Sequence, residues 1–243
     1  MAGYYKTEAI VLRSFRLREA DRIIHLYTAT HGRVGAVVKG VRRPKSRFGG
    51  RLEPFSHVDL SLYRGRELDI ITQAELVDPF RFLRQDYDRV MAGAAMLEAV
   101  DQVAQEREAA VRVFLLLVRA LRALDGDPGD PSAVLDAFLL KLMAVEGYRP
   151  VLTECAGCGR QAELRAFSAT RGGALCASCR NGGESLLDPG TVPLLSHLLG
   201  EDMERAAATK PRPVARREAA NVIKSYVEYH LDRRLRSYPL VNR

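Results

Sequence analysis

All four cysteines of the chain lie in two Cys-x-x-Cys pairs. The pairs are Cys155 with Cys158 and Cys176 with Cys179, and seventeen residues separate them. Two thiolates on one tight turn can bind the same metal ion, and two such turns complete the tetrahedron that zinc accepts. Because four cysteines leave no coordination position open, the pattern predicts one structural zinc ion per chain rather than a catalytic one.

The residues around the cysteines are basic, with Arg160, Arg165, Arg171 and Arg180 within or beside the two pairs. Arginine side chains commonly contact nucleic-acid phosphates. Contact between this module and nucleic acid therefore stays open beside a purely structural role.

A second group of residues suited to binding lies between residues 33 and 51, where the sequence contains no acidic residue. Its glycines and its proline predict a loop that follows a strand. Basic loops beside a small barrel can hold a phosphate backbone without reading sequence, although a merely solvated charge run is the alternative. Phe48, and Tyr63 on the next strand, are candidate surfaces for stacking bases. The side chains predicted to bind DNA are Arg33, Lys39, Arg42, Arg43, Lys45, Arg47 and Arg51.

Sequence motifs of the common enzyme classes are missing. There is no phosphate-binding loop of the G-x-x-x-x-G-K-[ST] type, no H-E-x-x-H, no G-x-S-x-G and no dinucleotide-binding glycine pattern. The five histidines are scattered and adjoin no such motif. The sequence therefore favours a binding protein over an enzyme, and we predict no catalytic residues.

Composition is that of a folded protein, with 47% hydrophobic and 28% charged residues in 243. Lys and Arg number 37 against 30 Asp and Glu, and the net charge of +7 permits a polyanionic partner. No apolar run approaches the roughly 18 residues that span a bilayer, and the N-terminus does not resemble a signal peptide. We expect a cytoplasmic protein with no membrane partner.

The first 80 residues have the alternating pattern of β-strands. In one segment Val58, Leu60 and Leu62 alternate with polar residues, which predicts one buried and one exposed face. Short strands without intervening helices favour a small barrel, with a five-stranded OB fold first and an SH3-like barrel second. The predicted strands are Tyr4–Arg13, Arg22–Thr28, Arg33–Lys39, His57–Arg64 and Glu67–Val77.

After Asp78 and Pro79 the apolar residues follow helical spacing. Asp130 and Pro131 predict the start of one helix, and a last amphipathic helix is expected from about Val214 to Arg236. The fold class is thus α+β, with an OB domain at 1–80, a helical domain at 81–243 and a zinc-finger module at about 150–187. The last helix adds basic residues that could extend a DNA track: Arg216, Arg217, Lys224, Arg233, Arg234 and Arg236.

Taken together, these features resemble the RecO family of bacterial recombination mediators. The resemblance rests on the first strand around Thr7–Leu12, the loop at Gly40–Arg47, the step at Leu52–Phe55, the helical second half and the four-cysteine module. It covers essentially the whole chain. The loop motif is the more specific part, because the cysteine pattern by itself is generic.

The resemblance implies an N-terminal OB fold and a helical domain with a zinc finger. It implies binding to single- and double-stranded DNA without sequence preference, and annealing of complementary strands coated by single-strand binding protein. It further implies cooperation with RecR in loading RecA recombinase, and recognition of the C-terminal tail of single-strand binding protein by the helical domain. Such a protein is bacterial, cytoplasmic and associated with the nucleoid.

Two other functions stay open on the residues alone. OB barrels and zinc ribbons also serve RNA-binding proteins, so the chain could be an RNA-binding module. It could also be a zinc-stabilised structural adaptor whose basic loop binds an acidic protein. Competition between matched DNA and RNA oligonucleotides distinguishes an RNA-binding module from a DNA-binding protein. Alanine substitution of the basic loop tests the adaptor, which predicts an unchanged affinity for nucleic acid.

Overall fold

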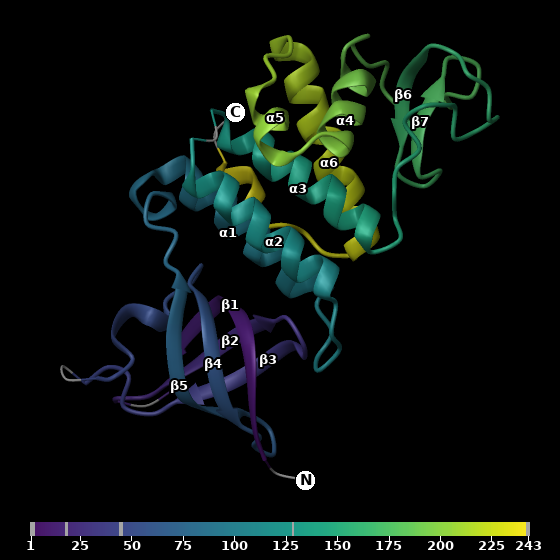
Figure 1. The fold of residues 1–243 in the computed structure, drawn as a ribbon. Helices are drawn as coiled ribbons and strands as arrows, with labels where there is room; N and C mark the ends of the chain where they lie inside the picture. Colours follow the sequence, from purple (N-terminus) through teal and green to yellow (C-terminus); the bar gives the residue numbers. More distant parts are fainter. Residues whose placement is uncertain (1–2, 18, 44–45, 128, 242–243) are drawn as a thin grey trace. The chain divides into compact units, whose positions relative to one another are not determined.

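The computed structural model describes residues 3–17, 19–43, 46–127 and 129–241. The chain divides into two compact units that interleave along the sequence (Figure 1). One comprises residues 1–85 and 97–125, and the other comprises residues 86–96 and 126–243. The linear division into domains at 1–80 and 81–243 stays a prediction. In the structure, residues 97–125 belong to the same compact unit as the barrel.

Five strands close into a barrel in the first unit. Their order is β1-β2-β3-β5-β4, and β3 and β5 are parallel while the other neighbours are antiparallel. This Greek-key order is that of an OB fold, so the predicted fold class is confirmed. The strands are β1 (Tyr4–Arg16), β2 (Arg22–Thr28), β3 (Gly32–Val38), β4 (His57–Tyr63) and β5 (Asp69–Asp78).

The barrel core is built from the alternating residues that the sequence singled out. Along β4, Val58, Leu60 and Leu62 are buried, and along β3, Val34 and Val38 are buried. Because successive side chains of a strand point to opposite faces, the intervening residues face away from this core. The barrel therefore presents an inner apolar face and an outer face that can carry function.

The loop that follows the first helix completes the barrel wall beside β3. β3 pairs with β5 only at its Ala36–Val37 end. Beside its first half, the backbone amide of Arg33 donates to Gln105 O at 3.1 Å, and the amide of Arg107 donates to Arg33 O at 3.2 Å. Gly32 is required at this junction, because its φ is +59° and a Cβ would lie 2.0 Å from the carbonyl oxygen of Glu108.

The second unit is mainly helical. Its centre is α3, which is buried on most of its surface and packs against α4, α5 and α6 (Figure 1). Asp130 caps α3 by accepting from the amide of Ser132, and Pro131 occupies its first turn, as the sequence predicted. The helices of the chain are α1 (Tyr87–Val103), α2 (Val111–Asp125), α3 (Pro131–Val145), α4 (Thr191–Gly200), α5 (Met203–Ala208) and α6 (Pro213–Leu231).

Two local predictions are corrected in this unit. The last helix ends at Leu231 rather than Arg236, because Asp232 adopts a left-handed conformation with φ of 50° that stops helical hydrogen bonding. Residues between the cysteine pairs, for which no strand was predicted, form the hairpin β6 (Leu164–Ser168) and β7 (Gly173–Cys176). None of the described helices is both long and apolar enough to cross a membrane.

Candidate nucleic-acid interface and metal centre

The basic loop between β3 and β4 is anchored to one end of the barrel by apolar side chains. Phe48 and Leu52 are buried in the barrel core, and Val41 packs against the same cluster. Leu52 belongs to a short 3-10 helix, Gly49–Leu52, that leads toward β4. The prediction that Phe48 offers a stacking surface is wrong, because only 3% of this residue is exposed. Its role is to fix the loop in place.

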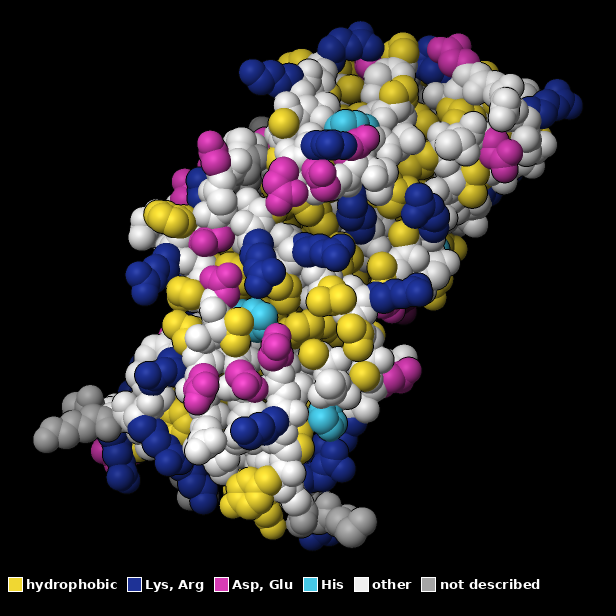
Figure 2. All heavy atoms as spheres, in the orientation of Figure 1, with side chains coloured by type: hydrophobic (Ala, Val, Ile, Leu, Met, Phe, Trp, Pro, Cys, Tyr) yellow, Lys and Arg dark blue, Asp and Glu magenta, His cyan; other side chains and the backbone are white. Residues whose placement is uncertain are grey.

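The charged side chains of the anchored loop remain on the surface. Lys39, Arg42, Arg43, Arg47 and Arg51 are exposed, and none of these five forms an ion pair within the described part of the chain. Dark-blue side chains gather on the barrel beside this loop (Figure 2). Lys45 lies outside the described residues. A concentration of cations without carboxylate partners is suited to contact with several phosphates.

Hydrogen bonds to backbone carbonyls orient some of these cations. Arg42 Nη1 donates to Glu19 O at 2.9 Å, and Arg51 Nη1 donates to Arg47 O at 2.7 Å. The guanidinium of Arg47 lies 5.0 Å from the centroid of the Phe48 ring. Each guanidinium has five N–H donors, so these contacts leave donors free for a ligand.

Arg33 differs from the other predicted side chains. It lies at the start of β3, whereas the loop follows the end of this strand, about 20 Å away along an extended chain. Its guanidinium lies 3.7 Å from the Asp101 carboxylate and 3.1 Å from that of Glu106. The structure therefore does not bring Arg33 together with the loop cations, and two carboxylates already compensate its charge.

One part of this surface was missed by sequence reasoning. Arg47 lines a groove together with Tyr4 and Lys6, which project from the outer face of β1. The available signal was the alternation along β1, where Thr7 and Ala9 are buried and Tyr4, Lys6 and Glu8 are exposed. Alternation alone did not identify the strands that lie beside β1.

The four cysteines come together in the second unit as the spacing predicted. Their Sγ atoms all lie within 4.8 Å of one another, and the Cys158 and Cys176 sulfurs are 4.0 Å apart. A zinc–sulfur bond of about 2.3 Å places the sulfurs of a tetrahedron about 3.8 Å apart. The donor set therefore fits one metal ion. Among the described residues it is the only such group of metal-ligating side chains.

Backbone geometry around the first pair supports a metal site. The amides of Gly157 and Cys176 each donate to the Cys155 sulfur at 3.4 Å. Burial alone would raise the pKa of the Cys155 thiol, but these amide donors outweigh it and the pKa falls to about 6. A Cβ at Gly157 would lie 3.2 Å from the Cys179 sulfur, so a larger residue would crowd the site. The turn is thus shaped for thiolate ligands.

The module around the cysteines has very little apolar core. Its buried cluster comprises Cys155, Ala166, Leu175 and Cys176, so half of its members are cysteines. A cluster of this size cannot offset the entropy of ordering the module, and small modules of this kind depend on a metal for stability. A metal at this site would therefore stabilise the fold of the module.

Most arginines of the module are engaged within it. Arg171 Nη1 donates to Cys179 O at 3.0 Å, and Arg165 donates to Leu187 O at 3.0 Å and pairs with Glu163. Arg180 donates to Glu184 O at 3.3 Å. These contacts hold the module's loops together, but each guanidinium keeps further donors, so contact with nucleic acid stays open beside the structural role.

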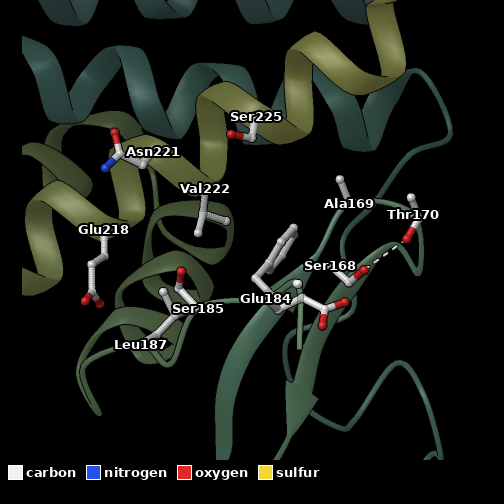
Figure 3. Close-up of a pocket in the computed structure, with 12 residues that line it drawn as sticks. Ser168, Ala169, Thr170, Glu184, Ser185, Leu187, Glu218, Asn221, Val222 and Ser225 are labelled. Carbon is white, nitrogen blue, oxygen red and sulfur yellow. Dashed lines mark hydrogen bonds between the residues drawn. The ribbon is translucent and has the colours of Figure 1, made fainter. Parts of the chain in front are cut away.

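A cavity of about 520 Å³ lies between β6, the segment that follows the second cysteine pair, and α6 (Figure 3). Two carboxylates border it. Glu218 Oε2 accepts from the amide of Asp188 and the hydroxyl of Thr191, whereas a buried oxygen of Glu184 has no partner within the described part of the chain. Two carboxylates make this cavity unsuited to a phosphate.

The last helix offers fewer free cations than its sequence suggested. Arg216 is 12% exposed and its guanidinium pairs with Asp136 and Asp130. Arg216 Nη2 also donates to Ser132 Oγ at 2.7 Å. Arg216 therefore holds α6 to α3 and is not available to extend a DNA track.

Comparison with known proteins places both halves of the sequence in one family. The family description "Recombination protein O N terminal" matches residues 1–80, and "Recombination protein O C terminal" matches residues 84–239. A protein of Nocardioides sp. named DNA repair protein RecO is 48% identical over 98% of this chain and 99% of its own length. Proteins of the same name from Frankia casuarinae and Thermobifida fusca are 46% and 45% identical, each over 98% of both chains. The resemblance seen in the sequence is confirmed, and the chain belongs to the RecO family of DNA repair proteins.

Proposed function

We propose that this protein binds single- and double-stranded DNA without sequence preference in recombinational repair, and that it does so without catalysis. The observation that carries the proposal is the anchored basic loop, whose five described cations are exposed and free of carboxylate partners. Phosphate contacts position a nucleic acid but read no sequence. The helical segment described in the loop is the four-residue 3-10 helix Gly49–Leu52, which is too short to serve as a base-reading helix.

Annealing of complementary strands follows from the same surface. Two strands repel each other through their phosphates, and a basic surface that holds both reduces this repulsion. Neutralisation needs no nucleotide hydrolysis. We therefore propose that the protein anneals complementary strands coated by single-strand binding protein in the absence of ATP.

The partners of this role are those that the family resemblance implies. The protein cooperates with RecR to load RecA, and its helical part binds the C-terminal tail of single-strand binding protein. A protein with this role acts in the bacterial cytoplasm, in association with the nucleoid. Support for these partners comes from membership of the family, whereas the basic loop supports the contact with DNA.

The metal of the cysteine site is proposed to be zinc, one ion per chain. Cys155, Cys158, Cys176 and Cys179 would hold it as thiolates, and four sulfurs match the preference of zinc for tetrahedral sulfur ligands. When bound, the ion supplies structural stability. The backbone amides described above orient the Cys155 sulfur toward it.

Fluorescence anisotropy with labelled oligonucleotides tests DNA binding. The variant Arg42→Ala/Arg43→Ala/Arg47→Ala should weaken binding to single strands and duplexes alike. The wild-type protein should show a slope of log K against log salt of about −3.5 on single strands if five phosphates are contacted, and the variant should show a shallower slope. A matched control with the same charge change is Arg112→Ala/Arg119→Ala/Arg149→Ala, whose side chains are exposed elsewhere.

Three results would contradict the proposal. An affinity that does not depend on salt, or equal binding by the loop variant and its control, would remove the loop as the DNA site. Preferential binding of a matched RNA oligonucleotide would favour an RNA-binding module instead. Cleavage of DNA in the presence of a divalent metal would show that the protein is an enzyme.

A further inference from the structure

The outer face of the barrel carries a groove of about 600 Å³ over β1, β4 and β5. We propose that this groove is a subsite for unpaired bases of single-stranded DNA, with Tyr4 as its stacking surface. The inference rests on the proposed DNA binding and names a subsite within it. The groove is lined by Tyr4, Tyr5, Lys6, Arg47, Ser61, Thr72 and Gln73.

Strand register orders the outer face into three rows. At one end, Tyr4 of β1 lies opposite Tyr63 of β4. In the next row Lys6 lies opposite Ser61, which lies opposite Gln73 of β5. The face therefore changes from aromatic to polar and basic within about 7 Å, because the two rows are two residues apart along β1 and a strand rises about 3.3 Å per residue.

The aromatic row is exposed in a way that a structural role does not explain. Tyr4 is 74% exposed, and its ring meets the Tyr63 ring with centroids 5.1 Å apart and planes at 64°. In this edge-on arrangement Tyr63 supports Tyr4 but does not stack on its face. A base stacks on such an exposed ring irrespective of its sequence, because every base has an aromatic face.

Cations and polar groups lie where the rest of a nucleotide would be. Lys6 and Arg47 line the groove, and neither forms an ion pair with any residue that the structure describes. Ser61 Oγ donates to Gln73 Oε1 at 3.1 Å, and this bond does not use the Gln73 amide nitrogen, which is a suitable donor for a base edge. Arg47 belongs to the basic loop, so one strand of DNA can contact the loop and the groove together.

A third row limits the groove on its far side. Glu8, Asp59 and Glu75 lie opposite one another on β1, β4 and β5. Acidic side chains gather on the barrel in Figure 2. Like charges on neighbouring strands repel one another and also repel phosphates. A strand held by the loop and the groove is thus prevented from continuing across this row.

Stacking on Tyr4 requires a base that is not already paired and stacked in a duplex. The groove therefore distinguishes single strands from duplexes, whereas the basic loop contacts the phosphates of both. The combination would give the protein a higher affinity for single strands than the loop provides alone. This preference is the measurable consequence of the groove.

The test compares Tyr4→Ala with Tyr4→Phe, which keeps the aromatic ring. Anisotropy is measured with an oligothymidine and with a hairpin duplex. Tyr4→Ala should weaken binding to the oligothymidine about 5- to 150-fold, the effect of losing one stacked base, and leave duplex affinity and the salt slope unchanged. Tyr4→Phe should bind both as the wild-type protein does. Tyr87→Ala, which removes a tyrosine that is 63% exposed elsewhere, is the matched control.

The outcomes separate this inference from the proposed function. If Tyr4→Ala binds the oligothymidine normally while the loop variant loses both ligands, the groove is not a base subsite and DNA binding stands. If Tyr4→Ala loses both ligands equally, single-strand selectivity is wrong. If neither variant changes binding, both the inference and the proposed function fail. Photocrosslinking with a 5-iodouracil oligonucleotide should attach to Tyr4 or Tyr63, and attachment only elsewhere would overturn the inference.

Discussion

The hydroxyl of Tyr5 on β1 donates a 2.5 Å hydrogen bond to the carboxylate of Asp69, the first residue of β5. Arg107, from the loop between α1 and α2, donates to the same carboxylate at 3.0 Å, and the amide of Gly65 donates at 3.0 Å. The side chain of Asp69 is fully buried. One carboxylate thus joins a barrel strand, a turn and a loop that lies more than thirty residues away in the chain.

Substitution Asp69→Asn should destabilise the barrel unit by about 2–3 kcal/mol, because hydrogen bonds to a buried charge are lost and the remaining donors are left poorly paired. Tyr5→Phe should cost less, about 1 kcal/mol, since it removes one donor. Urea denaturation followed by hydrogen exchange at barrel amides measures both. Asp59→Asn, an exposed carboxylate on β4, is the control and should change stability little. Equal effects of Asp69→Asn and Asp59→Asn would contradict this role.

The same carboxylate makes stability depend on acid. Burial raises the pKa of Asp69, but hydrogen bonds from Tyr5 and Arg107 outweigh it, so its pKa in the folded protein is below the ordinary value. The unfolded chain therefore binds the proton more readily, and the stabilisation is present above about pH 4 and lost as pH falls below it. Denaturation between pH 5 and pH 3 should show a smaller loss of stability in Asp69→Asn than in the wild-type protein. Parallel pH curves would argue against the assignment.

Metal removal should unfold the cysteine module first. Elemental analysis of the purified protein should give one zinc per chain, and Cys158→Ser should lower this content. A site of this type contributes on the order of 10 kcal/mol to local folding, so a chelator should abolish exchange protection in β6 and β7. Ser178→Ala is the control, because its hydroxyl lies 3.1 Å from the Cys176 sulfur but the residue is not a ligand. Absence of stoichiometric zinc in the wild-type protein would exclude the proposed metal.

Removal of one partner from the ion pair between Arg216 and Asp136 should strongly destabilise the helical unit. Asp136 has a fully buried side chain, and Tyr238 also donates to it at 2.8 Å. Arg216→Ala should cost about 3–5 kcal/mol, because it leaves a buried charge without its partner. Exposed Arg217→Ala is the control and should be close to neutral. Hydrogen exchange at the backbone amides of α3 and α6 locates the loss of stability. An exchange rate in Arg216→Ala equal to that of the wild-type protein would contradict the prediction.

Local patterns were sufficient for the four-cysteine cluster and for most of the barrel. Cysteine spacing predicted that the four sulfurs come together because two tight turns fix their geometry, and alternation identified the strands because one face is buried. Phe48 was misread because a single aromatic residue in a loop has no periodicity that shows which way it faces. Its burial depends on the barrel end, which is assembled from several strands.

Long-range pairing explains the other differences. Arg33 forms ion pairs with Asp101 and Glu106, about seventy residues later in the chain. The sequence around Arg33 gives no signal that predicts these partners. Likewise, the pairing of β1 with β4 brings Tyr4 beside Tyr63 and forms the acidic row beyond them. Such sites arise from register between distant strands, which periodicity within one strand does not specify.

The backbone bonds between β3 and the segment around Gln105 have a consequence for the N-terminal region when it is separated from the rest of the chain. Without that segment, the first half of β3 would present unsatisfied amide and carbonyl groups along an open edge. Open edges recruit further strands from other molecules. A fragment ending near residue 80 would therefore be prone to self-association, and the loop after α1 protects the barrel from aggregating.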